Sequence, residues 1–133
     1  SKKGTLRGLH YQLKYPQGKL VWVTKGAVVD IAVDIRKDSP TFGQSFSATL
    51  DDKKHMRLYI PPGFAHGFFV LSDYAIFQYK CTEYYRPQDE YGIYWNDKSL
   101  KIDLGDSKKF LSEKDQLLPR LNEIDSNLLP ILR

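Results

Sequence analysis

Two adjacent runs of β-branched residues constrain the fold more than any other feature of the chain. Residues 20–35 read LVWVTKGAVVDIAVDI, and Lys25-Gly26 separates the two runs. In the second run, apolar residues alternate with small or acidic ones, as at Asp30, Ile31 and Ala32. An alternation of period two is typical of a strand with one buried face. The segment therefore predicts a β-hairpin that turns at Gly26.

Further short strands are predicted at intervals of about ten residues, as in all-β proteins. They cover residues 46–50, 56–60, and a second hairpin of 68–71 with 75–82. Gly and Pro separate them, most clearly at Pro61-Pro62-Gly63. Only the end of the chain, from Ser112 onward, has the capping residue and apolar spacing of a helix. We therefore expect an all-β sandwich or barrel of antiparallel strands with a short C-terminal helical tail.

Composition narrows the classes of function. The 133 residues are expected to form a single domain (1–133), and 41% hydrophobic with 27% charged residues is ordinary for a globular protein. No apolar run is long enough to cross a bilayer, so no membrane partner is expected. The net charge of +4 comes from scattered lysines, which argues against nucleic acid and suits a small polyanion such as a nucleotide diphosphate. The single cysteine, Cys81, suits a reducing cytoplasm.

The three histidines are the main candidates for chemistry. His55 lies in a charged turn and is expected to be exposed, whereas His10 lies in a strand-like stretch and His66 in a loop stiffened by prolines. No His-x-His or His-x-x-x-His pair occurs, so no metal site is expected. A nucleophile elbow and a phosphate-binding glycine loop are also absent from the sequence, and Cys81 is expected to be a buried, inert thiol. The remaining candidate is acid–base chemistry by His10, aided by a carboxylate and a tyrosine.

Taken together, six motifs resemble the dTDP-4-dehydrorhamnose 3,5-epimerase family from Gly4 to about Pro119. The motifs occur in the family's order: RGLHYQ (7–12), PQGKLVWVTKGAVVDIAVDIRKDSPTFGQ (16–44), IPPGFAHGFFVLS (60–72), YKCTEYY (79–85), IYWND (93–97) and LSEKD (111–115). The resemblance implies a cupin-type jelly roll, a homodimer, and no metal or organic cofactor. It also implies inversion of carbons 3 and 5 of a nucleotide-linked 4-keto-6-deoxy sugar, used for surface polysaccharide.

The resemblance assigns four residues to the reaction. His10 matches the catalytic base and Asp115 its partner, Lys19 matches the lysine near the keto oxygen, and Tyr79 matches the acid on the other face of the sugar. Taken singly, Asp115 is a carboxylate at a helix N-terminus, Lys19 a turn lysine and Tyr79 a core tyrosine.

Five more residues match substrate-binding positions. Arg7 and Lys114 match the diphosphate contacts, His66 and Glu90 contact the substrate, and Tyr85 stacks on the nucleobase. Read without the family, Arg7, Lys114 and Glu90 are solvated surface charges, and His66 is a histidine that braces its loop. If their strand is regular, Tyr84 is expected on the opposite face from Tyr85.

Three hypotheses about the function stay open. The first is a cytoplasmic epimerase acting on a dTDP-linked sugar, and the second is the same chemistry on a GDP-linked 4-keto sugar such as a heptose. Relatives usually carry a further segment before the RGLH motif that adds substrate contacts and is not among these 133 residues. Either the sequence starts inside a longer chain, or the protein has lost part of its site. The third hypothesis is therefore a non-catalytic jelly roll that binds a nucleotide sugar.

Overall fold

The computed structural model describes residues 1–132, which form mainly short antiparallel strands joined by turns. One short helix, α1 (Glu113–Gln116), and four 3-10 turns (Pro87–Asp89, Lys98–Leu100, Leu121–Glu123 and Ser126–Leu128) accompany them. The strands are β1 (Leu6–Gln12), β2 (Lys19–Lys25), β3 (Ala27–Asp34), β4 (Ser45–Asp51), β5 (Leu58–Ile60), β6 (Phe64–Val70), β7 (Ile76–Cys81) and β8 (Glu90–Gly92).

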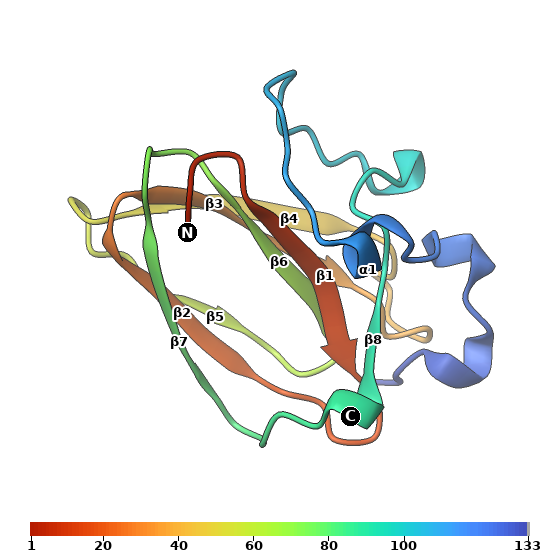
Figure 1. Cartoon of the computed structure of the whole chain (residues 1–133). Coiled ribbons are helices and arrows are strands. Elements are labelled where there is room, and N and C mark those ends of the chain that lie inside the picture. Colours follow the sequence, from red (N-terminus) through yellow and green to blue (C-terminus); the bar gives the residue numbers. More distant parts are fainter. Residues whose placement is uncertain (133) are drawn as a thin grey trace.

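The strands form two antiparallel sheets that face each other (Figure 1). The larger sheet has the order β4-β3-β6-β1-β8, and the smaller has the order β5-β2-β7. A cluster of aliphatic side chains between the sheets includes Val21 and Val23 from β2 and Val28 and Ala32 from β3. The predicted all-β class is confirmed, and two facing antiparallel sheets are the architecture of a jelly roll.

Both predicted hairpins are wrong, although the strands themselves are present. β2 pairs with β5 and β7, whereas β3 pairs with β4 and β6, so the chain changes sheet at Gly26. Gly26 has φ +86°, and a Cβ there would lie 2.3 Å from the carbonyl oxygen of Tyr74. β6 and β7 likewise lie in different sheets. Alternation predicts that a segment is extended, but it does not identify the strand that pairs with it.

The strand β3 is buried on both faces, which corrects the prediction of one buried face. Ile31 and Val33 pack against residues from the C-terminal part of the chain, among them Leu121 and Leu129. Asp30, at 0% exposure, faces the other sheet. The acidic positions of the alternating run are therefore interior positions.

The C-terminal tail is helical only in short turns. Ser112 caps α1, because its Oγ accepts a hydrogen bond from the backbone N–H of Asp115 at 3.1 Å. The expected apolar stripe is incomplete, since Leu121 is buried but Leu117 is 83% exposed. In residues 1–132 we find no helix with the length and apolarity needed to cross a membrane.

Candidate active site

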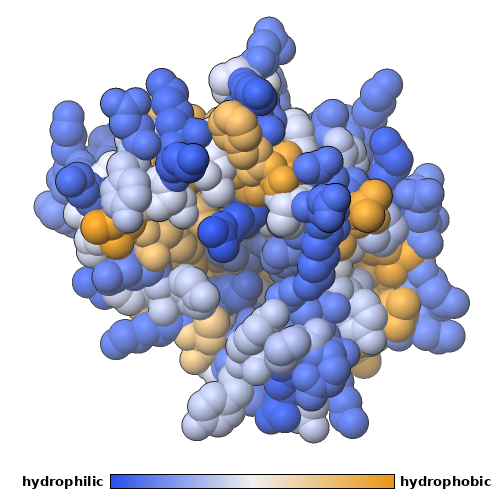
Figure 2. Space-filling model, viewed as in Figure 1, coloured by the Kyte–Doolittle hydropathy of each residue, from blue (hydrophilic) through white to orange (hydrophobic). Residues whose placement is uncertain are grey.

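A cleft of about 1030 Å³ opens between the two sheets. Figure 2 shows this face hollowed near its middle, with hydrophilic and hydrophobic residues both at the opening. The side chains that line the cleft include all nine predicted site residues: Arg7, His10, Lys19, His66, Tyr79, Tyr85, Glu90, Lys114 and Asp115. The fold thus brings into one cavity residues that lie more than a hundred positions apart in the chain.

The shortest polar contact at the cleft joins His10 of β1 to Asp115 of α1. Nε2 of His10 lies 2.6 Å from Oδ1 of Asp115, and the backbone N–H of Gly8 donates to Oδ2 at 3.1 Å. Gly8 has φ +106°, and a Cβ there would lie 2.6 Å from the carbonyl oxygen of His66 on β6. The register between β1 and β6 shifts at this point, so the glycine lets the strand bulge and point its N–H at the carboxylate.

Burial and hydrogen bonding act in opposite directions on Asp115. Burial raises the pKa of this carboxyl group, whereas the hydrogen bonds from His10 and Gly8 lower it. The lowering effects are larger in total, so the net shift is downward. The carboxylate therefore stays ionised beside the imidazole. The His10 side chain is 25% exposed, and its Nδ1 makes no hydrogen bond within residues 1–132. Nδ1 is thus the nitrogen that is open to a substrate.

A second histidine–carboxylate pair lies at the bottom of the cleft. Nε2 of His66 lies 2.7 Å from Oδ1 of Asp30, and the two side chains are 7% and 0% exposed. Burial lowers the pKa of His66. The hydrogen bond that Asp30 accepts and the charge of Asp30 oppose this shift, whereas the charges of Lys19 and His10 add to it. A neutral His66 donates Nε2–H to Asp30 and leaves the lone pair of Nδ1 as an acceptor.

The position of His66 differs from the sequence prediction, and Asp30 was not predicted at all. His66 lies in strand β6, paired with His10 on one side and Ala32 on the other, and not in a loop. The Pro-Pro-Gly turn ends one residue before this strand begins. The signal for Asp30 was its place in a run that is apolar apart from Asp30 and Asp34, because a buried carboxylate requires a partner.

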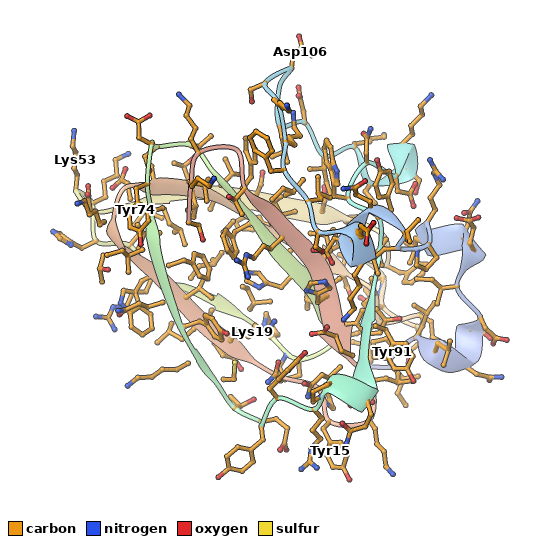
Figure 3. All side chains as sticks on the ribbon, viewed as in Figure 1. Tyr15, Lys19, Lys53, Tyr74, Tyr91 and Asp106 are labelled. Carbon is orange, nitrogen blue, oxygen red and sulfur yellow. The ribbon has the colours of Figure 1, made fainter. Side chains whose placement is uncertain are left out.

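Lys19 points from β2 into the space between the sheets (Figure 3). Burial lowers the pKa of its ammonium group, and Cys81, Glu90 and Asp30 oppose that shift in this order. Lys19 Nζ makes no hydrogen bond to any of the described side chains. Cys81 lies opposite Lys19 in the β2–β7 register and lines the cleft half-buried, in contrast to the buried thiol that we expected.

Apart from His66, the predicted substrate-binding residues form the rim of the cleft. Nζ of Lys114 lies 2.7 Å from Oε1 of Glu90, the first residue of β8, so these two are paired to each other. Arg7 is exposed on β1. Tyr85 is 60% exposed and Tyr84 is 82% exposed, and both line the cleft. Their segment is not a strand, so the regular strand on which the expected orientation of Tyr84 depended is not present.

The two walls of the cleft carry complementary groups. His10 and Asp115 lie on the side of the larger sheet, whereas Lys19 and the 60% exposed Tyr79 belong to the smaller sheet. The arrangement offers a base on one wall and a phenol with an ammonium group on the other. His55 is exposed, as predicted. Across residues 1–132, no three His, Cys, Asp or Glu side chains are grouped so that they can hold a metal ion.

The fold and the site define a jelly roll with a histidine–aspartate dyad in an open cleft, and comparison with known sequences identifies the family. The profile described as dTDP-4-dehydrorhamnose 3,5-epimerase matches residues 1–123. The chain belongs to the dTDP-4-dehydrorhamnose 3,5-epimerase family of isomerases, as the sequence motifs predicted.

Individual relatives agree with this assignment. The dTDP-4-dehydrorhamnose 3,5-epimerase of Pseudomonas aeruginosa is 53% identical over 118 residues, covering 87% of this chain and 65% of the relative. That of Shigella flexneri is 53% identical over 116 residues, covering 86% of this chain and 64% of the relative. The chain therefore spans about two thirds of the length of these relatives.

A solved structure matches the whole chain. The dTDP-6-deoxy-D-glucose-3,5-epimerase of Legionella pneumophila, crystallised with dTDP-4-keto-L-rhamnose, superposes with a TM-score of 0.97 at 51% identity. The match covers 100% of this chain and 71% of the Legionella chain. The predicted cupin-type jelly roll is confirmed by this likeness.

Proposed function

We propose that the protein epimerises a nucleotide-diphosphate-linked 4-keto-6-deoxy sugar at carbons 3 and 5, without a metal or organic cofactor. The observation that carries the proposal is the His10–Asp115 contact of 2.6 Å on one wall of the cleft, with Tyr79 and Lys19 on the other. Inversion at a carbon requires a proton to leave from one face and another to arrive from the opposite face. A base and an acid on different sheets supply that arrangement.

The proposed reaction begins with Nδ1 of His10, which takes the proton from carbon 3 or carbon 5. The electrons of the broken C–H bond form the double bond of an enolate, whose charge lies on the oxygen at carbon 4. Asp115 accepts Nε2–H and stabilises the imidazolium, while Lys19 stabilises the enolate oxygen. The phenol of Tyr79 then gives its proton to the opposite face, and solvent restores the proton of Tyr79 and receives that of His10.

Binding of the nucleotide part is proposed for the rim residues. Arg7 and Lys114 are the cations suited to the diphosphate, and Tyr85 offers an exposed ring to the base. Glu90 and His66 would accept hydrogen bonds from hydroxyl groups. The thymidine nucleotide is the first choice, because the similar Legionella enzyme was crystallised with a dTDP-linked sugar. A GDP-linked 4-keto sugar is the alternative.

Assembly and location are also proposals. We propose that residues 1–133 form one domain that works as a homodimer, on the basis of the family resemblance. The single cysteine among 133 residues supports a cytoplasmic location. The pathway proposed is the supply of a deoxy sugar for surface polysaccharide.

The proposal is tested by following deuterium incorporation from D2O with proton NMR, on dTDP- and GDP-linked 4-keto-6-deoxy sugars in parallel. We expect exchange at carbons 3 and 5 with the dTDP sugar. His10→Ala is expected to abolish exchange at both carbons and to retain nucleotide binding, whereas His55→Ala, which changes an exposed histidine, is expected to leave exchange intact. Binding without exchange in the unaltered protein would instead support a non-catalytic sugar-binding jelly roll. Full exchange in His10→Ala would contradict the mechanism.

A further inference from the structure

A stacked pair of phenylalanines joins the two sheets within the cleft. Phe68 comes from β6 and Phe77 from β7, their ring centroids are 4.4 Å apart, and their planes differ by 10°. Both rings line the cleft and pack on the aliphatic cluster between the sheets. The pair therefore presents a supported apolar surface to whatever occupies the cavity.

This apolar surface lies between two polar residues of the proposed mechanism. The ring centroid of Phe77 is 6.2 Å from that of His66 and 6.2 Å from that of Tyr79. The Cα of Phe68 pairs with that of Arg7 across β1 and β6. A sugar held between His66 and Tyr79 therefore lies close to the ring of Phe77.

The chemistry of a 4-keto-6-deoxy sugar indicates which of its groups would contact the phenylalanine rings. Its ring carbons carry oxygen substituents except at carbon 5, which carries the methyl group of carbon 6. A hydroxyl group against two phenylalanine rings would lose its hydration without gaining a partner, whereas a methyl group gains from burial there. Inversion at carbon 5 also carries this methyl from one face of the ring to the other, and a flat surface accommodates both positions.

We propose that Phe68 and Phe77 form the platform that receives the carbon 6 methyl, and that the platform determines whether carbon 5 is inverted. This inference rests on the proposed function, because it assumes exchange at the carbons beside the ketone. The platform acts on carbon 5 through its methyl substituent and does not contact carbon 3. Carbon 3 exchange therefore serves as the internal reference for the reaction.

The test compares deuterium incorporation at carbons 3 and 5 in the unaltered protein and in Phe77→Ala. Loss of the ring is expected to slow exchange at carbon 5 by roughly 10-fold or more relative to carbon 3, the scale of discrimination by a hydrophobic pocket. Phe77→Leu, which keeps an apolar side chain, is expected to restore most of the carbon 5 rate. Phe46→Ala, an exposed phenylalanine on β4 that does not line the cleft, is the control and should change neither rate.

A second substrate separates a methyl platform from a general packing role. A 4-keto sugar nucleotide with a hydroxyl group on carbon 6 is expected to exchange at carbon 5 about 10-fold or more slowly than the 6-deoxy sugar, and Phe77→Ala should narrow this difference. Equal slowing of both carbons in Phe77→Ala, or no change in either, would overturn the inference. Exchange confined to carbon 3 in the unaltered protein would also overturn it, but would leave the epimerase in place. No exchange at either carbon would contradict the proposed function itself.

Discussion

Nε2 of His66 lies 2.7 Å from Oδ1 of Asp30, and both side chains are buried at the bottom of the cleft. The other oxygen of Asp30, Oδ2, has no hydrogen-bond partner within the described residues. Lys19 lies near enough for the Asp30 charge to act on its ammonium group. The buried carboxylate thus fixes the tautomer of His66, a proposed substrate-binding residue, and its charge also acts on Lys19, a proposed catalytic residue.

This pair predicts that the stability of the fold depends on pH. Burial lowers the pKa of His66 below its ordinary value of 6.5, so below that pH the unfolded chain takes up a proton that the folded protein does not. The free energy of unfolding should therefore fall as pH decreases from 6.5, by up to about 1.4 kcal/mol per pH unit for this group. Urea unfolding between pH 8 and pH 5 measures the slope. His66→Gln should flatten it and His55→Gln should not; an unchanged slope in His66→Gln would assign the effect to other groups.

Asp115→Asn is expected to slow exchange at carbons 3 and 5 together. An amide still accepts the hydrogen bond from Nε2 of His10, but it carries no charge to stabilise the imidazolium. We expect a decrease in kcat of about 10²-fold or more, the usual scale of assisted proton transfer, with nucleotide affinity unchanged. Single-turnover NMR and nucleotide titration distinguish the two quantities. Asp73→Asn, on an exposed loop, is the matched control. Equal rates in Asp115→Asn and the control would remove Asp115 from the mechanism.

Tyr79→Phe should separate proton removal from inversion. The variant lacks only the phenolic oxygen, so the base on the opposite wall still works and deuterium still enters at the original configuration. We expect the yield of inverted sugar to fall by at least about 10-fold while exchange continues. Product configuration, read from proton coupling constants, decides the point. If exchange and inversion decline in parallel, Tyr79 is not the acid.

Gly8→Ala should disrupt the dyad through the backbone. A Cβ at Gly8 would lie 2.6 Å from the carbonyl oxygen of His66, and φ of +106° is unfavourable for alanine. The bulge that points the N–H of Gly8 at Asp115 should shift, with a loss of about 1–3 kcal/mol in stability and a drop in activity. Thermal unfolding and exchange rates test this together. Gly105→Ala, where φ is +75° but nothing lies within 4 Å of an added Cβ, separates the effect of strain from that of close contact.

The sequence predicted the strands and the site better than the pairing between strands. Alternation and Gly/Pro turns located β3 and β4 closely, because these signals are local. The assignment of β2 and β3 to one hairpin failed because both sheets need apolar strands, and nothing in residues 20–35 says which sheet each run joins. The one buried face assigned to β3 failed for a related reason, since distant residues such as Leu121 cover its other side.

Among site residues, the motifs found those that contact the cleft and missed one that acts from beneath it. His10 and Asp115 were brought together only by the family pattern, because 105 positions separate them and no spacing rule links them. Asp30 was visible as an acidic residue in an apolar run, but its partner His66 was expected in a loop. Only the β3–β6 pairing shows that the two side chains meet.

The crossing of the chain at Gly26 bears on how the protein acquires its activity during synthesis. Since β2 and β3 join different sheets, early strands find few partners among their immediate neighbours, and pairings between distant segments are slow to form. The two sheets are complete only after β6, β7 and β8 have been made, and His10 in β1 gains the carboxylate of Asp115 later still. Because synthesis runs from the N-terminus, Asp115 joins the cleft after the strands of both walls have been made, and a nascent chain that ends before Asp115 has His10 without its partner.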